Sequence, residues 1–281
     1  MLQLLSNITS KHSYTLENFL PLAGGDSNEV YLLKCTQREL VIKLNVAAHF
    51  PSMFAAEANG LQLLKNSKSF RIPEVVAFGA LNNKSYLLLE YIPTSQDSRV
   101  FCTQFAEQLS LLHQTTAAQF GLDHDNFIGS LPQYNTQNKT ASEFFILQRL
   151  EPQFKLAYNN GFKFTALDIL YKNISEIIPD EPPSLIHGDL WNGNYLLSQT
   201  QEAILIDPAV AFAPREMDLA MMRLFGGFPE NIFSIYNEIF PLEANYKSRI
   251  SLFQLYYLLV HLNLFGKIYQ SQVVNILKMY H

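Results

Sequence analysis

The sequence predicts an α+β fold of two lobes, a small β-rich N-terminal lobe over residues 1–92 and a large, mostly helical C-terminal lobe over residues 93–281. Three observations predict it. A chain of 281 residues suits one large domain or one domain with two lobes. β-type runs dominate the first ninety residues, and helical periodicity dominates from about residue 100 onward. The segment PTSQDS at residues 93–98 is a natural joint between the two patterns.

The N-terminal lobe is predicted from four strands and one helix. The strands are expected at residues 29–35, 39–45, 75–81 and 85–92, with the polar turns TQR and NNK joining neighbouring strands. Residues 53–66 have helical spacing and good helix formers, with one unfavourable glycine. These elements would form the β-rich lobe.

Helices are predicted through most of the C-terminal lobe. They are expected at residues 101–116, 142–160, 164–178, 215–227 and 250–266. Residues 184–197 and 202–210 are typical of loops and short strands. The last helix is highly apolar, but Gln254, His261 and Asn263 interrupt it, so we expect a buried helix rather than a membrane span.

Composition excludes several classes of protein. The net charge is −5 and there is no run of Lys or Arg, which argues against nucleic-acid and membrane partners. Cys35 and Cys102 are too few for a disulfide framework or a thiolate metal site. The N-terminus lacks the basic region of a signal peptide, so a cytoplasmic protein is expected. A monomer is expected, although the sequence leaves the oligomeric state open.

The segment LIHGDLWNGNYLL, residues 185–197, places several polar residues among apolar ones, which is costly unless they bond or act. Asn194 follows Asp189 by five residues, and Asp207 follows it by eighteen. These oxygen donors suit Mg²⁺ and a phosphate. In protein kinases an Asp at this place accepts the proton of the substrate hydroxyl, while the Asn and the second Asp bind metal. The intervals therefore predict Asp189 as catalytic base and Asn194 and Asp207 as Mg²⁺ ligands.

A lysine and a glutamate predict the ATP phosphate site of such an enzyme. Lys43 lies within the apolar run LVIKLN, and Glu57 follows it by fourteen residues on the predicted helix. In kinases a strand lysine of this kind binds the α- and β-phosphates and pairs with a helix glutamate. An ordinary surface pair is the alternative, and the apolar neighbours of Lys43 argue against it.

Further contacts to ATP are predicted from two loops. Gly24 and Gly25 would let the backbone approach the phosphates closely, and Asp26 begins the polar turn that follows them. Glu90 and Ile92, in LLLEYI, would give a backbone carbonyl and a backbone amide to adenine.

These motifs resemble those of the fructosamine (ketosamine-3) kinases, relatives of the aminoglycoside phosphotransferases within the protein-kinase-like fold. The resemblance covers residues 22 to 268 and includes GGDSNEVY, LVIKLN, IHGDLWNGN, LIDPAV, REMDLAMMRLFGGF and YYLLVHLNLFG. It implies ATP-dependent, Mg²⁺-dependent phosphorylation of the sugar 3-hydroxyl of ketoamines, either small molecules or glycated proteins. The 3-phosphorylated product would be unstable, so the sugar would later leave and the amine would be restored, which is deglycation. The resemblance gives Asp189, Asn194, Asp207 and Lys43 the roles above, and makes Trp191 a candidate to pack against the ketoamine.

Three departures from that pattern affect specificity or regulation. Ala211 and Ala213, in the segment 211–214, stand where relatives commonly have a Tyr-Tyr-Gly run, which puts the shape of a nearby pocket in doubt. Residues 133–145 lack tryptophans that many relatives carry. Ser27 occupies about the place of a cysteine found in some members, so no thiol switch is expected there.

Other functions and plainer roles stay open. The chain could phosphorylate an aminoglycoside, a choline-like alcohol or another sugar, or be a non-catalytic, pseudokinase-like ATP-binding module. His187 is expected to hold Asp189 in place, and His113 to lie in the core or at a helix end. Asp218 is expected to cap the start of its own helix. The loop at residues 121–129 is expected to line the substrate cleft.

Overall fold

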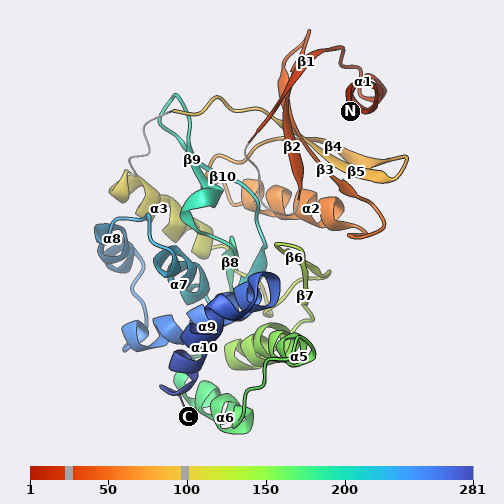
Figure 1. Cartoon of the computed structure of the whole chain (residues 1–281). Helices are drawn as coiled ribbons and strands as arrows, with labels where there is room; N and C mark the ends of the chain where they lie inside the picture. Colours follow the sequence, from red (N-terminus) through yellow and green to blue (C-terminus); the bar gives the residue numbers. More distant parts are fainter. Residues whose placement is uncertain (23–27, 96–100, 281) are drawn as a thin grey trace.

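In the computed structural model of the chain, residues 1–22, 28–95 and 101–280 are described (Figure 1). The N-terminal lobe is built on a five-stranded antiparallel sheet with the strand order β1-β2-β3-β5-β4. Its elements are α1 (Leu2–Lys11), β1 (Leu16–Pro21), β2 (Glu29–Cys35), β3 (Glu39–Val46), α2 (Met53–Asn66), β4 (Val75–Leu81) and β5 (Lys84–Glu90).

The alternation of side chains along strand β3 explains why Lys43 faces helix α2. Successive side chains of a strand point to opposite faces. Leu40, Ile42 and Leu44 of β3 are fully buried in a hydrophobic cluster that includes α1. Lys43 therefore points to the opposite face, where it meets Glu57 of α2. The period-2 pattern of one strand thus places a cation between the sheet and a helix.

Most predicted elements of this lobe are confirmed. The predicted bounds of β2, α2 and β4 are those of the structure, while β3 is one residue longer and β5 ends at Glu90. Helix α1 and strand β1 were not predicted. A helix of ten residues is marginal on its own, and α1 is stabilised by packing Leu5 and Ile8 on the sheet, which local sequence does not reveal.

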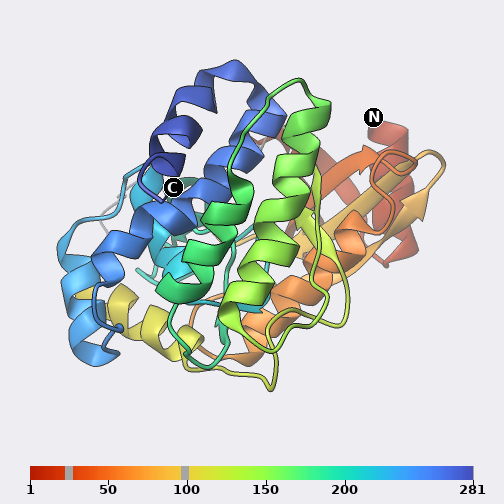
Figure 2. The ribbon, with the colours of Figure 1, turned by 90° about the horizontal axis from the view of Figure 1, so that it is seen from below.

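The C-terminal lobe consists of helices around short hairpins (Figures 1 and 2). Its first elements are α3 (Cys102–His113), β6 (Asn126–Ile128), β7 (Leu131–Gln133), α4 (Ala141–Phe144), the π-helix η1 (Phe145–Leu150), α5 (Glu151–Asn159), α6 (Leu167–Ile177) and β8 (Ser184–Ile186). The 3₁₀-helix η2 (Asn192–Asn194), β9 (Tyr195–Leu197), β10 (Ala203–Leu205), β11 (Ala211–Ala213) and α7 (Glu216–Leu224) follow. The chain continues through α8 (Asn231–Ile239), α9 (Tyr246–Phe265), the 3₁₀-helix η3 (Lys267–Tyr269) and α10 (Gln270–Leu277).

The helix predicted at 142–160 is confirmed, with a π-helical stretch inside it, and two helices of this lobe were missed. The elements α4, η1 and α5 follow one another without a break from Ala141 to Asn159. Pro152 lies in the first turn of α5 and has no N–H for the preceding turn, which is the π-helix η1. Helices α8 and α10 are short, with nine and eight residues, and were not predicted. Their buried faces pack on α3 and α9, respectively.

One hydrophobic cluster joins the two lobes, and another forms the centre of the helical lobe. The joining cluster contains Leu61 of α2, Leu89 of β5 and Leu109 of α3. Helix α9 is the centre of the second cluster and packs against α5, α7 and α10. It was expected to be a buried helix, and this is confirmed because residues on all its sides are buried. Within the described residues, no helix combines the length and apolar character needed to cross a membrane.

Candidate active site

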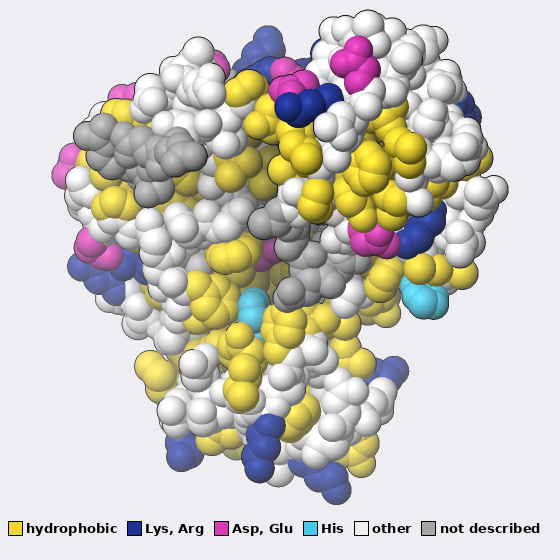
Figure 3. All heavy atoms as spheres, turned by 45° about the horizontal axis from the view of Figure 1, so that its top comes forward, with side chains coloured by type: hydrophobic (Ala, Val, Ile, Leu, Met, Phe, Trp, Pro, Cys, Tyr) yellow, Lys and Arg dark blue, Asp and Glu magenta, His cyan; other side chains and the backbone are white. Residues whose placement is uncertain are grey.

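A cavity of about 1010 Å³ brings together side chains that are far apart in the sequence. Figure 3 shows a hollow in this face of the molecule, bordered by hydrophobic side chains. Six of the predicted site residues line the cavity, and they come from both lobes. They are Lys43, Glu57, Asp189, Trp191, Asn194 and Asp207.

Lys43 links the two lobes inside the cavity. Its ammonium donates to Glu57 Oε1 at 2.6 Å and forms an ion pair with Asp207. The Lys43 side chain is only 7% exposed. Burial alone lowers the pKa of this lysine, but Asp207 and Glu57 outweigh burial and hold the pKa above its ordinary value. Lys43 is therefore a permanent cation, as a phosphate-binding group must be.

Asp189 lies beside Asn194 at the end of the loop after β8. The amide nitrogen of Asn194 donates to the Asp189 backbone carbonyl at 2.9 Å and to Asp189 Oδ2 at 3.2 Å. Burial, and then the negative charge of Asp207, raise the pKa of Asp189 to about 7, although the Asn194 hydrogen bond opposes the shift. A carboxyl group with this pKa can accept a proton near neutral pH.

The segment that carries Asp207 is clamped against the Asp189 loop. Asp207 has a left-handed backbone, with φ 55°, which is uncommon outside glycine. His187 Nε2 donates to the Ile206 carbonyl at 2.9 Å, and the Ala209 amide donates to the His187 carbonyl at 2.9 Å. A side chain on Gly188, which has φ 82°, would clash with the Ala209 carbonyl. These contacts fix the segment around Asp207.

His187 has the structural role expected for it. Its ring is fully buried, and its Nδ1 accepts from the Asp189 amide at 3.3 Å while Nε2 donates to the Ile206 carbonyl. Burial lowers the pKa of His187, so the neutral ring holds both acidic loops without adding charge.

Asp218 does not cap its helix, and that expectation was wrong. Its carboxylate accepts from the backbone amides of His187 at 2.7 Å and Gly188 at 2.8 Å. His113, at the end of α3 as expected, lies 3.3 Å from the same carboxylate. The helix therefore offers its acidic residue to the loop of Asp189 rather than to its own N-terminus. Sequence spacing could not show this, because 31 residues separate Asp218 from His187.

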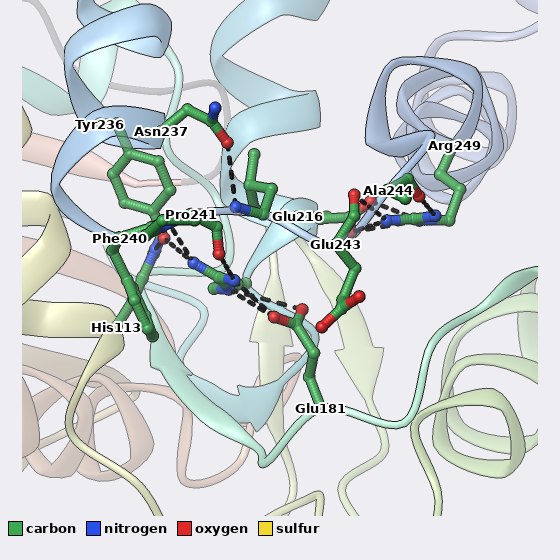
Figure 4. Close-up of polar contacts among 12 residues, drawn as sticks. His113, Glu181, Glu216, Tyr236, Asn237, Phe240, Pro241, Glu243, Ala244 and Arg249 are labelled. Carbon is green, nitrogen blue, oxygen red and sulfur yellow. Dashed lines mark hydrogen bonds and ion pairs between the residues drawn. The ribbon is translucent and has the colours of Figure 1, made fainter.

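Two buried arginines, Arg215 and Arg249, pair with carboxylates around helix α7; Figure 4 labels Arg249 and the Glu181 and Glu216 partners. Arg215 binds the Glu181 carboxylate and donates to the Phe240 carbonyl at 2.8 Å. Arg249 binds Glu216 through two nitrogens, with N–O distances of 2.9 and 2.6 Å. Bidentate arginine–carboxylate pairs fix geometry as well as charge. The sequence analysis did not single out these residues.

The remaining wall of the cavity is mostly apolar and aromatic, with the polar side chains of Asn28, Asn126 and Ser130 among them. Trp191 is 41% exposed and lies over Gly193, where any side chain would clash with the indole ring. Phe225 and His261 also line the cavity, with ring centroids 4.7 Å apart. Residues 126–130 complete this wall. The segment 121–129 therefore lines the cavity as expected, through its last four residues, although the first three of these form strand β6 rather than a loop.

Several residues predicted at or near the ATP site are not among those that line the described cavity wall. Gly24, Gly25, Asp26 and Ser27 lie outside the described residues, so the roles expected for them stay predictions. Glu90 ends β5 and its side chain pairs with Arg71, which the sequence did not indicate.

The adenine contacts and the altered segments lie away from the described cavity wall. Glu90 and Ile92 are not among the described residues that line the cavity, and their backbone contacts to adenine stay predictions. Ala211 and Ala213 are fully buried in the core, in strand β11 beside β8. The segment 133–145 likewise contributes no described residue to the wall. The pocket shape is therefore not set by direct contact with these two segments.

The donors around Asp189 suit Mg²⁺ shared with phosphates. Within residues 1–22, 28–95 and 101–280, no three His, Cys, Asp or Glu side chains gather closely enough to hold a metal by themselves. Mg²⁺ commonly takes one or two carboxylates and fills its shell with water and phosphate oxygens. The Asp207 carboxylate is 36% exposed and lines the cavity together with the Asn194 amide. This hard, incomplete oxygen set fits Mg²⁺ better than a softer metal.

The fold and this site define a phosphotransferase with a protein-kinase-like architecture. The aminoglycoside phosphotransferase APH(4)-Ia has the same fold, with a TM-score of 0.65 and 15% identity, and the alignment covers 100% of this chain and 99% of that one.

The chain belongs to the fructosamine kinase family, which it matches over residues 1–280. It is 39% identical over 268 residues to a "Probable ketoamine kinase" of Enterococcus faecium, which covers 92% of this chain and 94% of the relative. A "Putative fructosamine-3-kinase" from Haemophilus somnus superposes with a TM-score of 0.90 and 29% identity, over 99% of this chain and 97% of that one. The chain is an ATP-dependent phosphotransferase, and the predicted fold class and family resemblance are confirmed.

Proposed function

We propose that the protein transfers the γ-phosphoryl group of ATP to the sugar 3-hydroxyl of a ketoamine. Family membership supports ketoamines as the substrate class. The observation that carries the proposal is the single cavity, where Lys43, Glu57, Asp189, Asn194 and Asp207 lie together beside an aromatic wall.

Asp189 would act as the general base. As the 3-hydroxyl oxygen forms a bond to the γ-phosphorus, its proton passes to the Asp189 carboxylate and the bond between phosphorus and the ADP oxygen breaks. The raised pKa of Asp189 brings its basicity near neutral pH. Phosphoryl transfer requires mainly positioning and charge neutralisation, and little covalent chemistry from the protein.

Lys43 would bind the ATP phosphates, with Glu57 fixing its direction from α2. Asp207 and Asn194 would hold Mg²⁺, which when bound would neutralise charge on the phosphates. The Lys43–Asp207 ion pair must then loosen, because both groups would face the phosphates and the metal. His187 and Asp218 would hold the segments of Asp189 and Asp207 in place relative to each other.

The aromatic wall would receive the ketoamine. Trp191 and Phe225 offer flat apolar surfaces against which a sugar and its amine substituent can pack. Both small ketoamines and glycated lysines that reach into the cavity are candidate substrates. After phosphorylation the unstable 3-phosphate would be lost with the sugar, which restores the amine.

Product analysis tests this function. Purified protein is incubated with ATP, Mg²⁺ and a synthetic fructosamine or ribulosamine, and NMR identifies the phosphorylated carbon. We expect ADP formation that requires both Mg²⁺ and the ketoamine, with phosphate on C3. A matched ketoamine lacking the 3-hydroxyl should give no product. Equal turnover of that analogue, or turnover of only an aminoglycoside or a choline-like alcohol, would refute the proposal.

A further inference from the structure

A cluster of buried polar side chains lies behind the segment that carries Asp207, and among its members only Asn126 also belongs to the described cavity wall. Asn126 begins β6 and Gln133 ends β7, and the two residues face each other across the hairpin. Asn135 and Arg149 complete this set, which we call the amide cluster. All four residues are at most 5% exposed. Buried polar groups destabilise a fold unless they are bonded, so their partners are informative.

One chain of hydrogen bonds runs through the amide cluster in a single direction. Arg149 Nη2 donates to Asn135 Oδ1 at 2.8 Å. Asn135 Nδ2 donates to Asn126 Oδ1 at 2.9 Å, and Asn126 Nδ2 donates to the Val210 carbonyl at 2.8 Å. Each amide turns its oxygen toward the arginine and its nitrogen toward the segment after Asp207.

Gln133 forms a second chain with the same direction. The Tyr256 hydroxyl donates to Gln133 Oε1 at 2.7 Å, which fixes the orientation of the amide. Gln133 Nε2 then donates to Asn126 Oδ1 at 2.8 Å and to the Ala209 carbonyl at 3.0 Å. Both chains therefore end on consecutive carbonyls, two and three residues after Asp207.

Arg149 accounts for the direction of the first chain, as Tyr256 does for the second. The Arg149 guanidinium binds the carbonyls of Tyr134 and Gln148 and lies 4.4 Å from the centroid of the Phe144 ring. A buried positive charge attracts the oxygen ends of neighbouring amide dipoles. Arg149 also lies in the π-helix η1, and π-turns are frequent at functional sites.

We propose that Gln133 and Asn126 are positioning residues for Asp207, oriented by Tyr256 and Arg149. Their N–H groups hold the Ala209 and Val210 carbonyls from the core side. His187 holds the same segment from the other side, through the Ile206 carbonyl and the Ala209 amide. Clamped between them, Asp207 keeps its left-handed backbone and its carboxylate faces the cavity. This inference rests on the metal-binding role of Asp207 in the proposed function.

The first test compares two buried glutamines. Gln133→Met removes the donor to the Ala209 carbonyl, whereas Gln153→Met removes a similarly buried amide that accepts from Asn263 and does not line the cavity. Calorimetry measures ADP binding at increasing Mg²⁺ concentration. We expect Gln133→Met to raise the Mg²⁺ concentration for half-maximal binding about tenfold. Gln153→Met should change it less than about twofold.

Hydrogen–deuterium exchange adds a readout that does not depend on ligand. Peptides covering residues 206–212 should exchange faster in Gln133→Met than in Gln153→Met, because the Ala209 carbonyl loses its donor. An unchanged Mg²⁺ dependence together with unchanged exchange of this segment would overturn the proposal.

A second pair of variants keeps the test decisive if Gln133→Met fails to fold. Tyr256→Phe removes only the hydroxyl that orients Gln133. Tyr257→Phe is its control, because the Tyr257 hydroxyl is also buried but has no hydrogen-bond partner among the described residues. We expect Tyr256→Phe to shift the Mg²⁺ dependence about threefold and Tyr257→Phe to leave it unchanged. Equal values for the two variants would contradict the proposal. Since ADP binding needs no ketoamine, failure of the proposed reaction would be recognised separately.

Discussion

Buried charged side chains have different partners in the cavity and in the helical lobe behind it. Among the described residues that line the cavity, Lys43 is the single Lys or Arg, and it pairs with Glu57 and Asp207, while Asp189 adds a third carboxylate to the wall. Behind the cavity, in contrast, the buried arginines Arg215 and Arg249 each have their own carboxylate. Arg249 pairs with Glu216 in this way, and carbonyl groups take its remaining N–H groups.

This difference distinguishes charged side chains that would bind a ligand from charged side chains that stabilise the fold. Carboxylates outnumber cations in the described cavity wall, and the pKa of Asp189 is raised first by burial and then by the negative charge of Asp207. A metal ion would relieve that excess. The fully paired arginines need no ligand, so their contribution is to the shape of the lobe. Removing a charge should therefore affect turnover in the first region and stability in the second.

The largest effect is expected for Asp207→Ala. Loss of this carboxylate removes a predicted metal ligand and the partner of Lys43, so kcat should fall by about 10³-fold or more. The measurement is Mg²⁺-dependent ADP release with a ketoamine substrate. Asp123→Ala, on an exposed loop outside the described cavity wall, is the control and should change kcat less than about twofold. Near-normal turnover of Asp207→Ala would rule out its role.

In the helical lobe, Glu216→Gln should act on stability. It leaves the buried Arg249 charge without its carboxylate, so the free energy of unfolding should fall by about 3–5 kcal/mol. Glu230→Gln breaks the more exposed pair with Arg223 and should cost less than about 1 kcal/mol. Urea denaturation of the three proteins gives both values. Equal losses of unfolding free energy in the two variants would contradict the proposed difference between buried, paired arginines and surface ion pairs.

Much of the fold follows from local sequence patterns. Alternation in β2 and β3 and helical spacing in α2 predict their bounds closely, because those patterns reflect which face is buried. Short helices such as α1 and α8 are marginal on their own and depend on tertiary packing, which the local sequence does not show.

The site is predictable where its residues lie at kinase-like intervals, as Asp189, Asn194 and Asp207 do. Side chains that bind backbone groups of distant segments cannot be predicted in this way. Asp218 binds the amides of a loop 30 and 31 residues away, and Gln133 binds a carbonyl 76 residues away. Such contacts leave no spacing signal in a single sequence.

The pH dependence of turnover tests the electrostatic state of the cavity. The pKa of Asp189 is raised to about 7, so the carboxylate becomes protonated, and inactive as a base, as the pH falls through that value. We expect kcat/KM for Mg·ATP, which reports the enzyme before Mg·ATP binds, to fall about tenfold per pH unit below that point. Steady-state kinetics over a pH series gives the profile, and circular dichroism controls for folding. A plateau that continues to pH 5 would show that no group with this pKa acts as base.

The smallest effect is expected on the aromatic wall. Trp191→Ala should raise KM for the ketoamine about tenfold with little change in kcat, since the lost contact is with substrate rather than with the reacting groups. Because Trp191 is 41% exposed, the melting temperature should change little. Trp191→Phe should recover part of the affinity. A loss confined to kcat would place the indole nearer the chemistry than we propose.

The most direct test of the contrast between the two regions is to measure turnover and unfolding free energy together for Asp189→Asn. The account predicts that kcat falls about 10³-fold, because the base is lost. It also predicts that the unfolding free energy at pH 8 is unchanged or higher, by about 1 kcal/mol, because one of the crowded carboxylates is gone. A variant that keeps its turnover, or that loses stability as Glu216→Gln does, would contradict the account.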